Sequence, residues 1–151
     1  MSKKQRRTIG SIFKLPVDDY FVHGQILDDT EIVVFDTKGR KIEDPGEIVL
    51  QPILFRVSAN SDAILDGHWL KIGKAKISKE LSKPIPRYIQ DALSPDKYEI
   101  YERGVTRKAT RDECLGLECV AVWAVNHVTD RVRDHYNGVP NVWLQQCTLQ
   151  C

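Results

Sequence analysis

Four cysteines and four histidines are the side chains best suited to metal binding or nucleophilic catalysis. The cysteines are Cys114, Cys119, Cys147 and Cys151, and the histidines are His23, His68, His127 and His135. The cysteine spacings, C-x4-C and C-x3-C, differ from the C-x2-C pairs typical of structural zinc sites, and no histidine belongs to an H-E-x-x-H motif. We therefore expect neither a metal nor another cofactor.

An enzyme built on a cysteine nucleophile is the catalytic alternative. Cys119 paired in space with His23 would be one such site, and it would need a thiol with a lowered pKa. The residues around Cys114 and Cys119 form an apolar run, however, in which thiols commonly pack as small hydrophobic groups. G-x-S-x-G, Walker and G-x-G-x-x-G motifs are missing from the sequence. We expect reduced, buried thiols and no enzymatic activity.

Pairs of acidic residues beside predicted turns favour a binding surface over a catalytic site. Neighbouring acids in loops are most often solvated, whereas a catalytic pair needs a cleft and a raised pKa. Acidic loops with a nearby aromatic side chain suit a basic protein partner. The candidate binding residues are therefore Asp18, Asp19, Tyr20, Asp28, Asp29 and Glu31.

Length and charge place these residues in one small domain with a basic leader. A chain of 151 residues fits a single domain with a sizeable core, which we expect over residues 9–151. The net charge is +1, and four basic residues precede position 8, so the rest of the chain carries −3. We expect residues 1–8 to form a flexible basic leader. No run of about 18 apolar residues occurs, so we predict a cytoplasmic protein that does not bind membranes.

The first hundred residues predict the sheet that positions the acidic loops. Short extended runs separated by turn residues occur at 9–15, 20–27, 31–36, 47–58, 69–72 and 97–102. Pro52 interrupts the fourth run, which would make it an edge strand, a bulged strand or two strands meeting at a corner. Five to seven strands at this spacing favour a curved antiparallel sheet or a small open barrel over about residues 9–102.

One long helix is predicted after the sheet. Thr110 and Glu113 form a capping box, an apolar stripe follows, and Asn137-Gly138 is a helix-ending signal. These signals predict a helix over about residues 110–136, packed across the sheet because its middle is apolar on nearly every side. A last strand through Val142 to Leu149 is also indicated. The fold class is therefore α+β.

The stretch GHWLKIGK, residues 67–74, raises the question whether Trp69 belongs to a site or to the scaffold. Tryptophan favours burial, so we interpret Trp69 as a core residue between turn glycines. Together with GSIFKLPVDDYFVHGQIL, VVFD and PILFRVS, this stretch resembles the immunity protein 26 family of bacterial polymorphic toxin systems. The resemblance covers about residues 9–80 and is carried by Gly10, Phe13, Pro16, Gly24, Phe55, Val57, Trp69, Ile72 and Gly73.

The resemblance implies a non-catalytic antidote that binds and neutralises a cognate toxin domain. The family-marking residues would then maintain the fold, and specificity would lie in variable loops. The part of the chain from Thr110 onward shows no family motif. A small β-barrel that binds nucleic acid through its basic leader is the alternative function, but the acidic body of the chain disfavours it.

Overall fold

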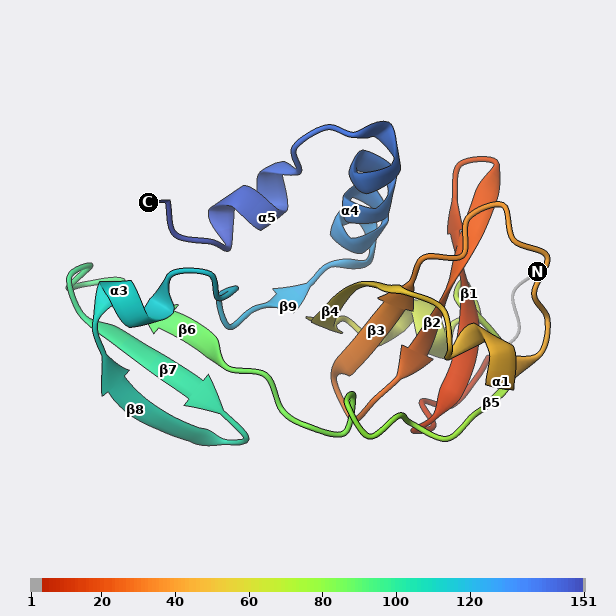
Figure 1. The fold of residues 1–151 in the computed structure, drawn as a ribbon, viewed down its shortest axis with the longest axis horizontal. Helices are drawn as coiled ribbons and strands as arrows, with labels where there is room; N and C mark the ends of the chain where they lie inside the picture. Colours follow the sequence, from red (N-terminus) through yellow and green to blue (C-terminus); the bar gives the residue numbers. More distant parts are fainter. Residues whose placement is uncertain (1–3, 151) are drawn as a thin grey trace.

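The computed structural model describes residues 4–150 and shows a large open sheet with a smaller sheet beside it (Figure 1). The six-stranded sheet has the order β5-β1-β2-β3-β4-β9, and the three-stranded sheet has the order β6-β7-β8. The strands of the large sheet are β1 (Ser11–Val17), β2 (Tyr20–Ile26), β3 (Glu31–Phe35), β4 (Ile53–Ala59), β5 (Leu70–Lys74) and β9 (Val122–Trp123). Those of the small sheet are β6 (Arg87–Gln90), β7 (Tyr98–Glu102) and β8 (Val105–Ala109).

Five helices complete the described fold, and the longest one packs on the large sheet. They are α1 (Pro45–Ile48), α2 (Asp62–Leu65), α3 (Arg111–Cys114), α4 (Val125–Asn137) and α5 (Val142–Gln146). The α+β class is confirmed, with one C-terminal helix, α4, against a mostly antiparallel sheet. The sheet is open between its edge strands β5 and β9, so it does not close into a barrel.

Both faces of the large sheet are buried. On one face, Phe13, Leu15 and Val34 pack with Val128 and Val132 of α4. The opposite face has a separate core made of Ile12, Leu27, Val33, Phe35, Ile48 and Leu81. Alternate strand residues point to opposite faces, so β1 and β3 each supply apolar side chains to both cores.

Trp69 is a scaffold residue, as the sequence indicates. Its side chain is fully buried immediately before β5 and stacks on Phe13 with the ring centroids 5.2 Å apart. Gly24 lies opposite Phe13 in the β1–β2 ladder and leaves room for that ring. Gly73 has a similar role, because a Cβ there would lie 2.6 Å from Cγ of Pro45. Two of the glycines that mark the family resemblance, Gly24 and Gly73, are therefore required by close packing.

The long helix predicted over residues 110–136 is interrupted. The capping box of Thr110 and Glu113 is present, but α3 ends at Cys114 and Gly116 has a φ of +85°. The chain then runs in an extended form until α4 begins at Val125. Helix α4 ends at Asn137, and Gly138 is its C-cap with a φ of +67°, as predicted. The apolar run before α4 is strand-like because it pairs with both sheets. A short apolar run does not distinguish a buried strand from a buried helix.

Other predicted elements also differ from the structure. The run at 47–58 begins within α1, where Asp44 caps the helix and Pro45 occupies its first turn, and β4 starts only after Pro52. The final strand predicted through Val142 to Leu149 is instead the short helix α5, capped by Asn141. Strands β6 and β8 were not predicted. In both segments a capping side chain favours a helix, although the apolar pattern alone predicts a strand.

Two residues of the basic leader, Gln5 and Arg7, contact the body of the fold. Residues 1–3 lie outside the described residues. The Gln5 side chain donates to the carbonyl oxygens of Ile64 and Trp69 and accepts from the Lys71 amide at 2.9 Å. Arg7 donates to the backbone oxygen of Asp28. Gln5 and Arg7 are therefore held against neighbouring elements, and the flexibility expected for residues 1–8 stays a prediction.

Replacing Gly24 with alanine tests the close packing of β2 on Phe13. A Cβ at Gly24 would lie 2.8 Å from Cε2 of Phe13 and 2.9 Å from the Val33 carbonyl oxygen. We expect Gly24→Ala to lower the free energy of unfolding by about 2 kcal/mol in urea denaturation, because a buried strand cannot move away freely. Gly46→Ala is the control, since its Cβ would meet nothing closer than 3.5 Å, and it should be neutral or slightly stabilising. Equal effects of the two substitutions would contradict this account.

Candidate binding site between the two sheets

The segment from Glu118 to Trp123 joins the two sheets. The Glu118 carbonyl accepts from the Tyr88 amide, and the Val120 amide donates to the Tyr88 carbonyl at 2.9 Å, which attaches the segment to β6. Two residues later, β9 pairs in parallel with β4, with Trp123 opposite Ala59. Figure 1 shows this segment passing between the small sheet and α4. The segment therefore fixes the position of one sheet relative to the other.

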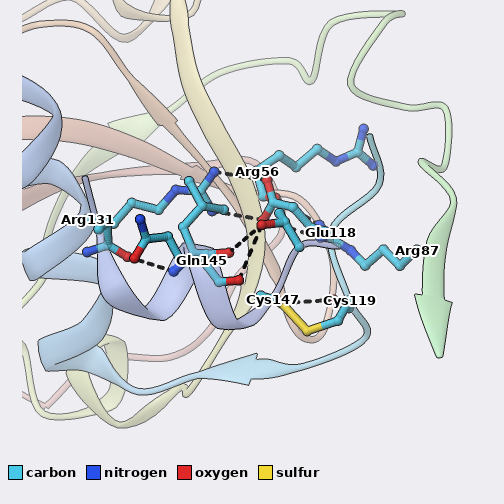
Figure 2. Close-up of a disulfide and its surroundings, with 10 residues drawn as sticks. Arg56, Arg87, Glu118, Cys119, Arg131, Gln145 and Cys147 are labelled. Carbon is cyan, nitrogen blue, oxygen red and sulfur yellow. Dashed lines mark hydrogen bonds and ion pairs between the residues drawn. A yellow bond between two sulfur atoms is a disulfide. The ribbon is translucent and has the colours of Figure 1, made fainter. Parts of the chain in front are cut away.

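Glu118 is also the centre of a partly buried ionic cluster (Figure 2). Its carboxylate accepts two hydrogen bonds from Arg131 of α4, each 2.9 Å long. On its other side, the Arg87 guanidinium of β6 lies 4.0 Å away. Arg87 donates to the Arg56 carbonyl oxygen of β4 at 2.8 Å, and the Arg56 side chain pairs with Glu31 of β3. Three strands, β3, β4 and β6, and one helix, α4, thus meet through charged side chains.

Arg131 is held by aromatic rings as well as by Glu118. Its guanidinium carbon lies 4.3 Å from the centroid of the Phe55 ring and 5.0 Å from that of Trp123. Planar guanidinium groups stack favourably on aromatic faces while their edges donate to a carboxylate. This arrangement fixes the Glu118 carboxylate on the side that faces Arg131.

A disulfide follows Glu118 directly. Cys119 is bonded to Cys147, which comes after α5, and the Cys119 amide donates to the Cys147 carbonyl oxygen at 2.8 Å. The expectation of four reduced thiols is therefore wrong for this pair, because packing of α5 brings the two sulfur atoms together. Cys114 is a buried free thiol, and Cys151 lies outside the described residues. A Cys119 nucleophile paired with His23 is excluded while the disulfide is formed, because Cys119 is bonded to Cys147 and His23 is hydrogen-bonded to Thr37.

A cleft of about 560 Å³ lies between the two sheets beside this cluster. Its polar lining includes Arg56, Arg87, Arg103, Glu31 and Asp28, and its apolar lining includes Leu27, Ile77, Ile85, Val120 and Val122. A cleft with apolar walls and a few convergent charged groups is the usual form of a binding site. We therefore treat this cleft as the candidate functional site.

Two of the predicted binding residues line this cleft, and a third lies in the adjoining turn. Asp28 and Glu31 line it, and Asp29 is exposed in the same β2–β3 turn. The Asp28 carboxylate accepts from the Thr30 and Glu31 amides at 2.9 Å and 2.7 Å, which holds the turn. The Glu31 carboxylate is already paired with the Arg56 guanidinium. Of these three side chains, Asp29 is therefore the one most available to a partner.

The other three predicted residues lie at the opposite end of β2, where Asp18 and Tyr20 contact α4. Asp18 has a φ of +51° in the β1–β2 turn and accepts two hydrogen bonds from Arg133, of 2.8 Å and 2.9 Å. The Tyr20 ring packs edge-on against Tyr136 at 5.9 Å. Asp19 is exposed. Because β2 has seven residues, roughly 20 Å of strand separates the two turns, and the six residues do not form one continuous rim.

The main residues of the cluster had little signal in the sequence. Arg56 lies within the apolar run ILFRVSA. A charged residue inside a predicted strand is the one feature of the sequence that could have indicated its role. Arg87, Glu118 and Arg131 are brought together by chain segments far apart in sequence, and no spacing rule links them. Within residues 4–150, no group of three metal-binding side chains and no helix suited to crossing a membrane was found.

Comparison with known proteins assigns the scaffold. Residues 8–99 match the sequence profile described as Immunity protein 26, which is more than half of the chain. The chain belongs to the immunity protein 26 family. No curated protein and no solved structure matches it. The family region spans β1 to the first residues of β7 and includes Arg56 and Arg87, whereas Glu118, Arg131 and the disulfide lie beyond it.

The disulfide is expected to stabilise the attachment of α5. It closes a loop with a sequence separation of 28. Loss of a crosslink of this size costs about 3 to 4 kcal/mol when the main effect is on the unfolded chain. Reduction should therefore lower the melting temperature measured by differential scanning calorimetry. The Cys119→Ser/Cys147→Ser double variant should melt at the lower temperature with or without reductant, and an unchanged melting temperature of the reduced protein would contradict the assignment.

The ion pair between Asp18 and Arg133 gives a pH-dependent prediction. Hydrogen bonds from Arg133 hold the pKa of Asp18 below its usual range, so the pair stabilises the fold above the unfolded pKa of the carboxyl group. This stabilisation is lost as the pH falls through the lower folded pKa. Arg133→Gln should raise the Asp18 pKa in a carbon-13 NMR titration. The pKa of Asp91, which the Ser94 and Leu93 amides lower, should not change. If the pKa values of both carboxyl groups rose, the low pKa of Asp18 would not be caused by its pairing with Arg133.

Proposed function

We propose that this protein is the non-catalytic antidote of a bacterial polymorphic toxin, which it binds and neutralises in the cytoplasm of the producing cell. The observation that carries the proposal is the match of residues 8–99 to the immunity protein 26 family. An antidote needs a rigid surface of defined shape and charge and no reaction of its own. The packed scaffold around Phe13, Gly24 and Trp69 would supply that rigidity.

The cleft supports a binding role for its polar residues. Its polar cluster consists of arginines and carboxylates that pair with one another, and Glu31 and Glu118 already have guanidinium partners. A catalytic carboxylate would need a free position and a raised pKa, whereas a binding surface uses paired charges to orient a partner. We therefore favour recognition over catalysis at this cleft.

We further propose that the toxin docks on the cleft end of the large sheet. Asp28, Asp29 and Glu31 gather there beside the cleft. Asp18 and Tyr20 already contact Arg133 and Tyr136 of α4, so their more direct role is to hold that helix. An acidic turn beside a cleft would attract a basic surface of the toxin and increase the rate of association.

Affinity capture followed by a growth assay tests the proposed function. The tagged chain is used to recover proteins from a lysate of its native bacterium, and mass spectrometry identifies the bound chains. We expect a 1:1 complex with the C-terminal domain of a large secreted protein, and co-expression of this chain should restore growth of cells that express that domain. Captured domains that remain toxic in the presence of this chain would contradict the proposal. Salt-sensitive retention of nucleic acid in place of a toxin would favour the nucleic-acid-binding alternative.

Charge reversal at two exposed acids tests the docking face. Asp29→Lys at the cleft end should slow association with the recovered toxin domain by about threefold to tenfold in surface plasmon resonance. Asp19→Lys is the matched control at the far end of β2, and it should change the association rate little. Added salt should reduce the difference, because it screens exposed charges. The opposite ranking of the two variants would place the toxin on the β1–β2 end.

The disulfide provides a test of the proposed compartment. Reducing cytoplasm disfavours structural disulfides in most bacteria. Rapid acid quenching of cells, followed by differential alkylation, measures how much of Cys119 and Cys147 is oxidised in vivo. If the protein works in the cytoplasm, the disulfide should form to the same extent in cells that lack the periplasmic oxidation system. Full oxidation that depends on the periplasmic oxidation system would contradict a cytoplasmic location.

A further inference from the structure

The partly buried cluster between the sheets contains one more positive charge than it contains negative charges. Its cations are Arg56, Arg87 and Arg131, and its anions are Glu31 and Glu118, which leaves a balance of +1. The side chains of Arg56, Arg87 and Arg131 are only 12%, 9% and 10% exposed. A buried cation without a full partner is costly, so the imbalance calls for an anion from elsewhere.

Arg87 is the cation that lacks a full partner. Of its five N–H donors, one is used at short range, from Nη2 to the Arg56 carbonyl oxygen. Both oxygens of Glu118 already accept from Arg131, and the Arg87 Nη1 atom remains 4.0 Å from the nearer one, which is too long for a hydrogen bond. Burial lowers the pKa of Arg87 despite the neighbouring carboxylates, which agrees with incomplete compensation.

The unused donors of Arg87 belong to a side chain that lines the cleft. Arg56 lines the same cleft, and Arg103, in the β7–β8 turn, adds a third guanidinium to its wall. A guanidinium presents parallel N–H groups that match the two oxygens of a carboxylate. The acidic β2–β3 turn also lines the cleft through Asp28 and would bind basic side chains next to that carboxylate.

We propose that Arg87 in the inter-sheet cleft binds a carboxylate that the cognate toxin inserts from a protruding loop. The inference rests on the proposed antidote function and specifies the chemistry of its partner. The inserted loop carries an Asp or Glu side chain for Arg87 and Arg103, flanked by a basic side chain for Asp28 or Asp29. The same chemistry would accept a free carboxylate or phosphate ion, and the two sources are separated by experiment.

Binding measurements with three variants test the role of the arginines. Arg87→Lys keeps the charge but loses the paired donors. It should weaken binding of the recovered toxin domain by about tenfold or more in isothermal titration calorimetry. Arg103 is an exposed turn residue with a positive φ, which asparagine tolerates. Arg103→Asn should weaken binding of the toxin domain by a few fold. Lys108→Asn is the matched control, since it removes one exposed charge from the same hairpin outside the cleft, and it should bind as the wild type does. Circular dichroism and melting temperatures show which variants are folded.

NMR of the arginine side chains gives a readout that does not depend on folding of the Arg87 variant. The Nε–H signal of Arg87 is followed while the free chain is titrated with sodium acetate or inorganic phosphate, with sodium chloride as the ionic-strength control. We expect a saturable shift with acetate and a shift of the same signal when the toxin domain binds. An Arg87 signal that responds to neither ion nor to the toxin would overturn the inference.

The remaining outcomes separate this inference from the proposed function. If the toxin binds and growth is restored, but Arg103→Asn and a folded Arg87→Lys bind as tightly as the wild type, the inference fails and the antidote function stands. If phosphate shifts the Arg87 signal and the toxin does not, the cleft accepts a free anion and the toxin-derived carboxylate is excluded. If no toxin is bound while acetate still shifts the signal, the antidote function fails and the oxyanion site remains.

Discussion

The attachment of the segment around Glu118 to both sheets is the constraint on which the rest of the structure depends. Its backbone pairs with β6, its continuation pairs with β4, and its carboxylate accepts both hydrogen bonds from Arg131 of α4. Two sheets with separate cores would otherwise be connected mainly by the proline-containing stretch before β6. The cleft exists because this segment holds the small sheet beside the large one without filling the space between them.

The cleft combines parts of the chain with different relations to the family. Arg56 and Arg87 lie within the matched residues 8–99, whereas Glu118 and Arg131 lie beyond them. The matched region forms nearly all of the large sheet, whose glycines and aromatic residues are needed for packing. The cleft is therefore built partly from residues within the family match and partly from residues beyond it. The family supports the proposed antidote function, and the charges around the cleft support the proposed docking face.

The sequence predicted the large sheet well because its signals are local. Alternating apolar residues and turn acids at Asp18-Asp19 and Asp28-Asp29 marked β1, β2 and β3, and burial of Trp69 followed from its size. The break at Gly116 was missed because a helical stripe and a strand that pairs on both sides contain the same apolar residues. Of the six candidate site residues, Asp28 and Glu31 lie at the cleft, but the arginines facing them could not be found. Their approach depends on pairing between segments tens of residues apart, which leaves no periodic pattern.

Hydrogen exchange of the free chain and of its complex with the recovered toxin domain would test the docking face most directly. The account predicts new protection in the β2–β3 turn, in the β7–β8 turn and in the segment from Glu118 to Val122, because these elements surround the cleft. Amides near Asp18 to Tyr20 should exchange at nearly the same rate in both states. Protection confined to the β1–β2 turn, with unchanged exchange around the cleft, would contradict the account.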